Sequence, residues 1–226
     1  MISAKLVMVC HRGMRKYFSL VAILVFLLIA FIIHPQVISV PINYQKATVV
    51  FGENPVKSCN SKQFSPANRL WCLIYERERL MKEVAANKYP QKKPIYDGVR
   101  EIAVLDNIGT IAKKNKLPVR EMQLYSQIVM DVSRQIQQYW FDLWKNESTT
   151  AKLSLNQIRQ RIDQIDEAIV NSFGLIRGSN SITFEQIQDG LRKSLADLDG
   201  IYPSSDRELF IDLLSKVIYS VVNPIK

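Results

Sequence analysis

The chain has 226 residues, of which 47% are hydrophobic and only 8 are glycine, and its formal net charge is +9. This composition is typical of one or two compact domains of helical type. With only two histidines and no CxxC pair, a metal site is not expected. The basic charge would suit nucleic acid, but no recognised nucleic-acid-binding motif occurs, so we expect no such partner.

Residues 1–39 are predicted to be an export signal. An uninterrupted apolar run covers residues 20–33, and no acidic residue occurs before Glu53. The basic residues ahead of the run are Lys5, Arg12, Arg15 and Lys16. A basic segment followed by an apolar one is typical of a secretory signal, and a start at Met14 would make it a more ordinary one. We therefore expect cleavage before Val40 and a periplasmic or secreted protein.

An uncleaved anchor is the alternative, because residues 18–33 are near the lower length limit for crossing a bilayer. In that case the inner membrane would hold the protein through this segment alone. Two cysteines, Cys59 and Cys72, remain after the signal, on either side of a short polar stretch. In an oxidising compartment they could form a disulfide. Two unpaired thiols, one of them buried on a helix, are the other interpretation.

The rest of the chain is predicted to be helical throughout. Residues 40–64 look irregular, and Ser65 and Pro66 then mark a helix start. Apolar residues at helical spacing predict helices to about residue 89, over 95–115 with Ile102 turned inward, and from Pro118 to about 146. After a polar linker at 146–151, helices are expected over 155–170, 181–200 and 203–222. We expect an all-α bundle of about six helices, with a core at 65–146 and a C-terminal half at 152–226.

Basic and amide side chains occur at positions that should converge. Arg77 and Lys88 are eleven residues apart, about three helical turns, and therefore project from nearly the same face. Arg100 lies early on the next helix, and Ser133 and Gln137 share one face at i, i+4. Cations and donors on separate helices suit a small ligand with several carboxylates. Ordinary exposed charges on amphipathic helices are the alternative.

The ordered set resembles the all-helical chorismate mutases over about residues 65–175. It comprises Arg77, Lys88, Asp97, Arg100, Glu101, Ser133 and Gln137. The ending QQYWFDLWKN is similar to the exported, or gamma, subclass. LNQIRQRIDQIDEAIV, at 155–170, resembles the first helix of the intracellular enzymes, where Arg159 matches an arginine that enters an active site. Alternatively, Arg159 and Arg161 are only exposed charges of an amphipathic helix.

The resemblance implies that chorismate is rearranged to prephenate without a cofactor. Arg77, Arg100 and Arg159 would bind the two substrate carboxylates, assisted by Ser133. Lys88 and Gln137 would donate hydrogen bonds to the ether oxygen, while Asp97, through its backbone, and Glu101 would hold the ring hydroxyl. In the gamma subclass the second half of the same chain completes the site. Here we also expect that half to support a homodimer.

The chain also departs from the gamma pattern. It has Gln137 where some relatives have glutamate and Val104 where some have glutamine, and its second half lacks their cysteine pair. A different class of function is a non-catalytic helical module outside the cytoplasm, which would bind an anionic ligand or a protein partner.

Overall fold

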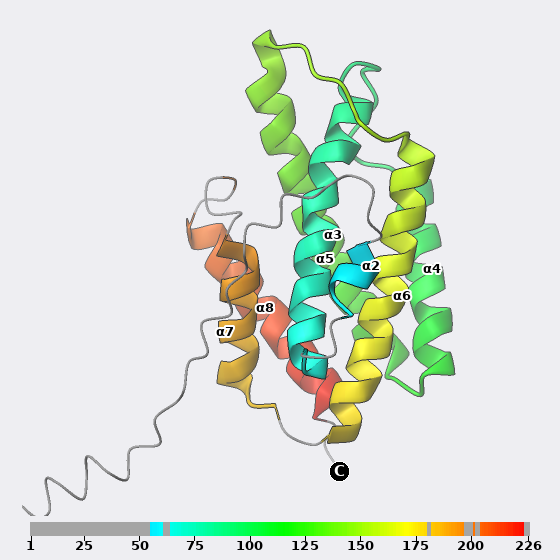
Figure 1. Cartoon of the computed structure of the whole chain (residues 1–226), viewed down its shortest axis with the longest axis vertical. Helices are drawn as coiled ribbons and strands as arrows, with labels where there is room; N and C mark the ends of the chain where they lie inside the picture. Colours follow the sequence, from blue (N-terminus) through cyan, green and yellow to red (C-terminus); the bar gives the residue numbers. More distant parts are fainter. Residues whose placement is uncertain (1–54, 61–63, 180–181, 197–200, 202–203, 224–226) are drawn as a thin grey trace, which may run out of the picture. The chain divides into compact units, whose positions relative to one another are not determined.

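The computed structural model describes residues 55–60, 64–179, 182–196, 201 and 204–223, all within one compact unit, Val49–Lys226. Over these residues the only regular elements are helices, which confirms the all-α class (Figure 1). The predicted signal or anchor at 1–39, most of the irregular segment at 40–64, and residues 181, 197–200 and 203 of the last two predicted helices lie outside the described residues. None of the helices in the described ranges is long and apolar enough to cross a membrane.

Seven α-helices are described, and six of them are those that the sequence predicts. They are α2 (Pro55–Ser58), α3 (Pro66–Lys88), α4 (Gly98–Lys114), α5 (Val119–Leu143), α6 (Leu155–Ser179), α7 (Phe184–Leu195) and α8 (Ser204–Val222). A 3-10 turn, Trp144–Asn146, follows α5. The unexpected helix is α2, in the segment predicted to be irregular. Helix α6 continues past the predicted residue 170 because Phe173 and Ile176 extend its buried stripe.

The ends of the helices follow from their capping residues. The hydroxyl of Ser65 accepts a hydrogen bond from the backbone N–H of Asn68 at 3.1 Å, which starts α3. Asp97 caps α4 in the same way through Arg100, at 3.2 Å, and its own backbone is not helical. Helix α4 therefore begins three residues later than predicted.

One inward-facing residue of α4 was predicted wrongly. Val104, Ile108 and Ala112, spaced four residues apart, form the buried face of this helix. Ile102 was expected to point inward but is 62% exposed, because that stripe turns it toward solvent. The apolar residues that recur at helical spacing on α3 are all buried, namely Leu70, Leu73, Ile74, Leu80, Met81 and Val84.

Helix α3 is at the centre of the packing. It contacts α5, α6, α7 and α2, while α4 packs against α5 and α6 and α8 packs against α5, α6 and α7. Figure 1 shows α7 and α8 on the side of α3 and α5 away from α4. The contact between α3 and α7 requires a glycine, since a Cβ at Gly190 would lie 2.3 Å from Nε1 of Trp71. The two halves of the chain therefore share one core.

A disulfide fixes the short helix α2. Cys59 and Cys72 are bonded with an S–S distance of 2.10 Å, which is the pairing that the sequence favours in an oxidising compartment. The bond joins the end of α2 to the buried face of α3. Because α2 also contacts α6, the bond ties together the two helices that supply Lys88 and Arg159.

Candidate active site

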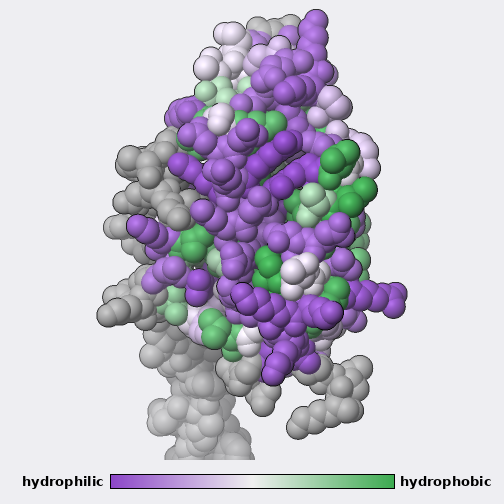
Figure 2. Space-filling view, turned by 90° about the vertical axis from the view of Figure 1, so that its right-hand side faces the viewer, coloured by the Kyte–Doolittle hydropathy of each residue, from purple (hydrophilic) through white to green (hydrophobic). Residues whose placement is uncertain are grey.

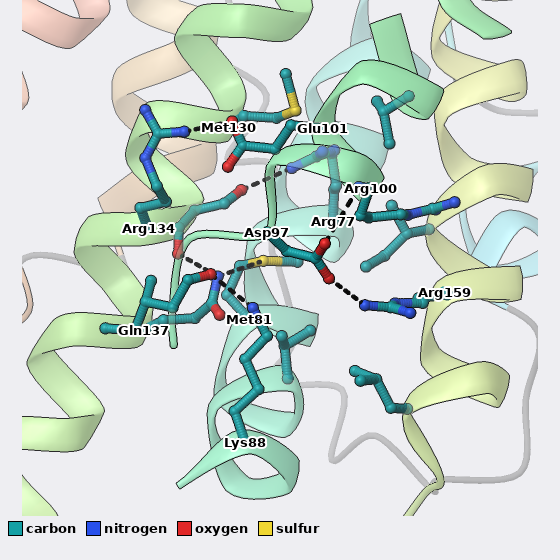
Figure 3. A pocket seen from close by; sticks show the side chains of 16 residues that line it. Arg77, Met81, Lys88, Asp97, Arg100, Glu101, Met130, Arg134, Gln137 and Arg159 are labelled. Atoms are coloured by element: carbon teal, nitrogen blue, oxygen red, sulfur yellow. Dashed lines mark hydrogen bonds and ion pairs between the residues drawn. The ribbon is translucent and has the colours of Figure 1, made fainter. Parts of the chain in front are cut away.

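A pocket open to solvent, with a cavity volume of about 80 Å³, lies among α3, α4, α5 and α6. All eight residues predicted from the sequence line it. These are Arg77, Lys88, Asp97, Arg100, Glu101, Ser133, Gln137 and Arg159. Figure 3 shows Lys88 of α3 and Arg159 of α6 reaching toward this space. The first and second halves of one chain therefore both contribute to the pocket.

Lys88 enters from the last turn of α3. Its side chain is buried, and Nζ donates a hydrogen bond to the carbonyl of Ile95 at 2.6 Å. Among the described ion pairs none involves this ammonium group. Burial lowers the pKa of Lys88, although the carboxylate of Asp97 acts in the opposite direction. An ammonium group with spare N–H donors therefore faces the pocket.

Two arginines of the pocket are paired with aspartates. Arg159 Nη2 lies 2.6 Å from Oδ2 of Asp97, and Arg100 Nη2 lies 2.5 Å from Oδ1 of Asp163. These side chains are partly exposed, so solvent and ligands can reach them. Asp97 has two functions, since its other oxygen caps α4. Each arginine is thus held in place while remaining accessible from the pocket.

Arg77 lies deeper and is almost fully buried. Its Nε donates to Asp166 at 2.8 Å, and its Nη1 donates to Glu78 at 3.1 Å and to Ser133 at 2.7 Å. Burial opposes the charge of Arg77, but the two carboxylates outweigh it and raise its pKa. The hydroxyl of Ser133 is also within 2.9 Å of the Val129 carbonyl. Ser133 is therefore in contact with Arg77 and Glu78 as well as with the pocket.

Gln137 is buried, and both described contacts of its amide nitrogen lie within the pocket wall. Nε2 donates to the carbonyl of Ser133 at 3.0 Å and lies 4.0 Å from the sulfur of Met81. The amide oxygen has no hydrogen-bond partner among the described residues. The amide nitrogen carries two N–H groups, so one of them can donate to a ligand while the other stays on the Ser133 carbonyl.

Arg134, next to Ser133, also lines the pocket, although the sequence did not single it out. Its Nη1 donates to Glu101 at 2.6 Å, its Nη2 pairs with Asp131, and its guanidinium lies over the ring of Tyr96. The hydrogen bond to Glu101 raises the pKa of Arg134. Glu101 is thus held by an arginine of α5.

Three acidic residues of the site were also not predicted. Glu78 directly follows Arg77, while Asp163 and Asp166 lie on α6, four and seven residues after Arg159. A signal for Asp166 was available, because it falls on the buried stripe of α6 between Ile162 and Ile169. A carboxylate in an apolar stripe requires a partner, which here is Arg77.

The charge of the lining favours an anionic ligand. The lining contains five cationic side chains, from Arg77, Lys88, Arg100, Arg134 and Arg159, and two carboxylates, from Asp97 and Glu101. Outside the lining, Glu78, Asp131, Asp163 and Asp166 pair with three of these arginines. Figure 2 shows the face formed by α4 and α6, where hydrophilic side chains predominate and hydrophobic ones form separate patches. A concave site with convergent cations can bind a small molecule that carries more than one carboxylate.

Comparison with known proteins identifies the helical core. Residues 68–138, which form most of α3, all of α4 and most of α5, match the family model described as chorismate mutase type II. The helical core at residues 68–138 is therefore a domain of the all-helical chorismate mutase family, whose members are enzymes.

Two crystal structures share the fold. One is a chorismate mutase from Burkholderia thailandensis, with a TM-score of 0.52 and 19% identity over 70% of this chain and 99% of that one. The other is a chorismate mutase from Burkholderia phymatum, with a TM-score of 0.56 and 20% identity over 66% of this chain and 93% of that one. The likeness extends beyond the matched core, since it covers about two thirds of this chain.

Proposed function

We propose that the chain is an exported chorismate mutase, which converts chorismate to prephenate by an intramolecular sigmatropic rearrangement. The observation that carries the proposal is the convergence of Lys88, Arg100, Arg159 and Arg77 from three helices on one pocket. The reaction breaks a C–O bond and forms a C–C bond within one molecule. It therefore needs a binding site that holds the substrate in a compact shape.

The two carboxylates of chorismate are proposed to bind the arginines. Arg100 and Arg159 are partly exposed and paired with Asp163 and Asp97, which substrate carboxylates would replace. Arg77 is buried and held rigidly by its neighbours, so it would contribute a fixed donor at the base of the pocket. Carboxylates bound at fixed positions hold the two reacting carbons close together, which lowers the entropic part of the barrier.

Lys88 and Gln137 are proposed to stabilise the breaking bond. Negative charge grows on the ether oxygen as the C–O bond lengthens, so donors at this oxygen bind the transition state more strongly than the substrate. Lys88 spends one N–H on Ile95 and has others available. Gln137 uses one N–H on the Ser133 carbonyl and would direct the other to the substrate.

The ring hydroxyl is assigned to the start of α4. The backbone of Asp97 and the carboxylate of Glu101 would hold it, and Arg134 fixes that carboxylate in place. Ser133, proposed to assist a substrate carboxylate, lies against Arg77 and would act together with it.

The absorbance of chorismate provides the test, because it disappears on rearrangement. The purified protein should consume chorismate and form prephenate, and an Arg77→Ala variant should not. Binding of chorismate without turnover would instead favour a non-catalytic module that binds anions.

Export is proposed from the first 39 residues, and the disulfide supports it because such bonds persist in oxidising compartments. Protein recovered from its native compartment should resist alkylation at Cys59 and Cys72 until it is reduced. Two freely alkylated thiols would contradict this. Fusion of residues 1–39 to a reporter enzyme that is active only outside the cytoplasm tests export directly.

A homodimer supported by the C-terminal half is also proposed. Leu209 and Leu213 of α8 are exposed one helical turn apart, which fits a contact surface on that half. Light scattering of the purified protein measures the mass directly. A monomer at working concentration would exclude the dimer without affecting the proposed reaction.

A further inference from the structure

Arg77 carries one positive charge but contacts two carboxylates. Its guanidinium contacts two buried carboxylates, Asp166 at 2.8 Å and Glu78 at 3.1 Å. Both carboxylates are almost completely excluded from solvent. If both were ionised, the group behind the pocket would carry a net charge of −1 and would repel an incoming dianion. A buried uncompensated charge is also costly to the fold.

The hydrogen bonds of Ser133 indicate which carboxylate would take up a proton and so remove the excess negative charge. The oxygen of Ser133 lies 2.7 Å from Nη1 of Arg77, 2.9 Å from the carbonyl of Val129 and 3.2 Å from Oε2 of Glu78. A hydroxyl has one hydrogen to donate. If Glu78 were ionised, the Val129 carbonyl and Oε2 of Glu78 would compete for that hydrogen. The Val129 carbonyl also accepts the helical hydrogen bond within α5, so a hydroxyl directed to Val129 would leave Oε2 as the atom without a donor. If Glu78 is protonated, it donates to Ser133, Ser133 donates to Val129, and every contact is satisfied.

Asp166 does not offer the same solution. Its Oδ1 accepts a short hydrogen bond from Arg77, as an ionised carboxylate does. Its Oδ2 is buried and has no hydrogen-bond partner among the described residues. Burial raises the pKa of Asp166, while Arg77 acts to lower it, but a proton on Oδ2 would have no described acceptor. Asp166 is therefore the counter-ion of Arg77, and Glu78 is the group that carries the proton.

We propose that Glu78 and Asp166 are positioning residues for Arg77, and that the form of the enzyme that binds substrate has Glu78 protonated and Asp166 ionised. The proposal rests on the proposed function, since Arg77 is assigned there to a substrate carboxylate. In this form the buried group is neutral overall. Its guanidinium is fixed by Asp166 on one edge and by Ser133 and Glu78 on the other.

The groups that face Glu78 come from three helices. They are Arg77 on α3, Ser133 and Tyr125 on α5, and Asp166 on α6; Arg100 of α4 acts on Asp166. Burial raises the pKa of Glu78 to about 7, although Arg77 and Ser133 act to lower it, and Asp166 raises it further. Burial likewise raises the pKa of Tyr125, so this phenol stays neutral. Glu78 thus loses its proton within the range in which the enzyme can be assayed.

The proposal predicts a split between two kinetic parameters. Because kcat/KM reports the free enzyme, it should be level below about pH 7 and fall roughly tenfold for each pH unit above it. Bound dianion favours the proton on Glu78, so kcat should stay level to higher pH. A residue needed only for folding would not move KM and kcat differently with pH.

The test uses the full chain with Glu78→Gln, Glu78→Ala and Asp166→Asn, with Glu167→Gln, an exposed neighbour on α6, as the control. The amide in Glu78→Gln reproduces the contacts of the protonated acid, so it should remove the fall in kcat/KM and keep the value of the acid plateau within about threefold. Glu78→Ala has no such amide, so its kcat/KM should not keep the value of the acid plateau. Asp166→Asn removes the charge that raises the pKa of Glu78, so the fall should begin at lower pH. A Glu78→Gln variant with an unchanged fall overturns the proposal.

A measurement without substrate separates this inference from the proposed reaction. Carbon NMR of the full chain labelled at glutamate carboxyl groups should show one signal that titrates near pH 7 and is absent in Glu78→Gln. That result would stand even if the protein did not rearrange chorismate. An active enzyme in which the Glu78 signal titrates at the usual glutamate pKa would overturn the inference and leave the proposed function intact.

Discussion

Replacement of Lys88 by alanine tests the proposed chemistry most directly. The ammonium of Lys88 is held at 2.6 Å from the Ile95 carbonyl, so its remaining N–H bonds can point at the ether oxygen. Loss of one such donor costs roughly 10²–10³-fold in kcat, which corresponds to about 3 kcal/mol or more of transition-state stabilisation. The donor acts mainly as charge develops, so kcat should fall more than KM changes.

The fold should tolerate this change. Burial already lowers the pKa of Lys88, which means that the charged form is disfavoured at this position. Removal of the charge therefore relieves a cost, and water can reach the Ile95 carbonyl from the open pocket. We expect the free energy of unfolding to stay within about 1 kcal/mol of the wild-type value.

Lys82→Ala is the matched control, because Lys82 is an exposed lysine of the same helix whose Nζ lies over the ring of Trp140. It should lose about 0.5–1 kcal/mol of stability and keep its kcat. Steady-state kinetics on chorismate and urea denaturation measure both quantities. A folded Lys88→Ala enzyme with kcat within about threefold of wild type would refute the assignment of Lys88 to the breaking bond.

Three further changes test other parts of the structure. Arg159→Ala should raise KM and lower kcat, whereas Arg161→Ala should change neither. A mixture of Arg159→Ala chains with inactive Arg77→Ala chains should show no restored activity. Recovery of activity in the mixture would indicate a site shared between subunits. Wild-type kcat should be nearly independent of pH from weakly acidic to weakly basic conditions, because the amide of Gln137 does not titrate. Gln137→Glu should instead give a kcat that falls as pH rises. A wild-type enzyme that is active only in acid would contradict this prediction. Gly190→Ala should lower the free energy of unfolding by about 1–3 kcal/mol through overpacking against Trp71, and an unchanged urea midpoint would show that α7 moves freely.

Helical periodicity was sufficient to predict most of the fold. Apolar residues on α3 and α5 recur at helical spacing over more than twenty residues, so local pattern and burial agree. The four-residue helix α2 is too short to show a period, and the disulfide, rather than its own sequence, fixes it to α3. The start of α4 depends on the capping side chain of Asp97. A pattern of apolar residues carries no information about that hydrogen bond.

The candidate site was predictable where one helix presents two residues, as Arg77 and Lys88 do, because the spacing alone places them on one face. The partners of these residues were not predictable. Asp166 reaches Arg77 across 89 positions of the chain, and Asp163 reaches Arg100 across 63, so both contacts exist only after α6 packs against α3 and α4. Arg134 was missed for the same reason, since its ion pair with Glu101 joins α5 to α4.

The pairing of Arg100 with Asp163 and of Arg159 with Asp97 bears on which molecules the pocket accepts. If ligand carboxylates bind Arg100 and Arg159 as proposed, they would take the places of these two aspartates, so binding would exchange one ion pair for another. A ligand with one carboxylate can displace only one of them, and the other aspartate then remains as a negative neighbour. The pocket should therefore bind monocarboxylic acids weakly, because its own aspartates compete with them for the two arginines.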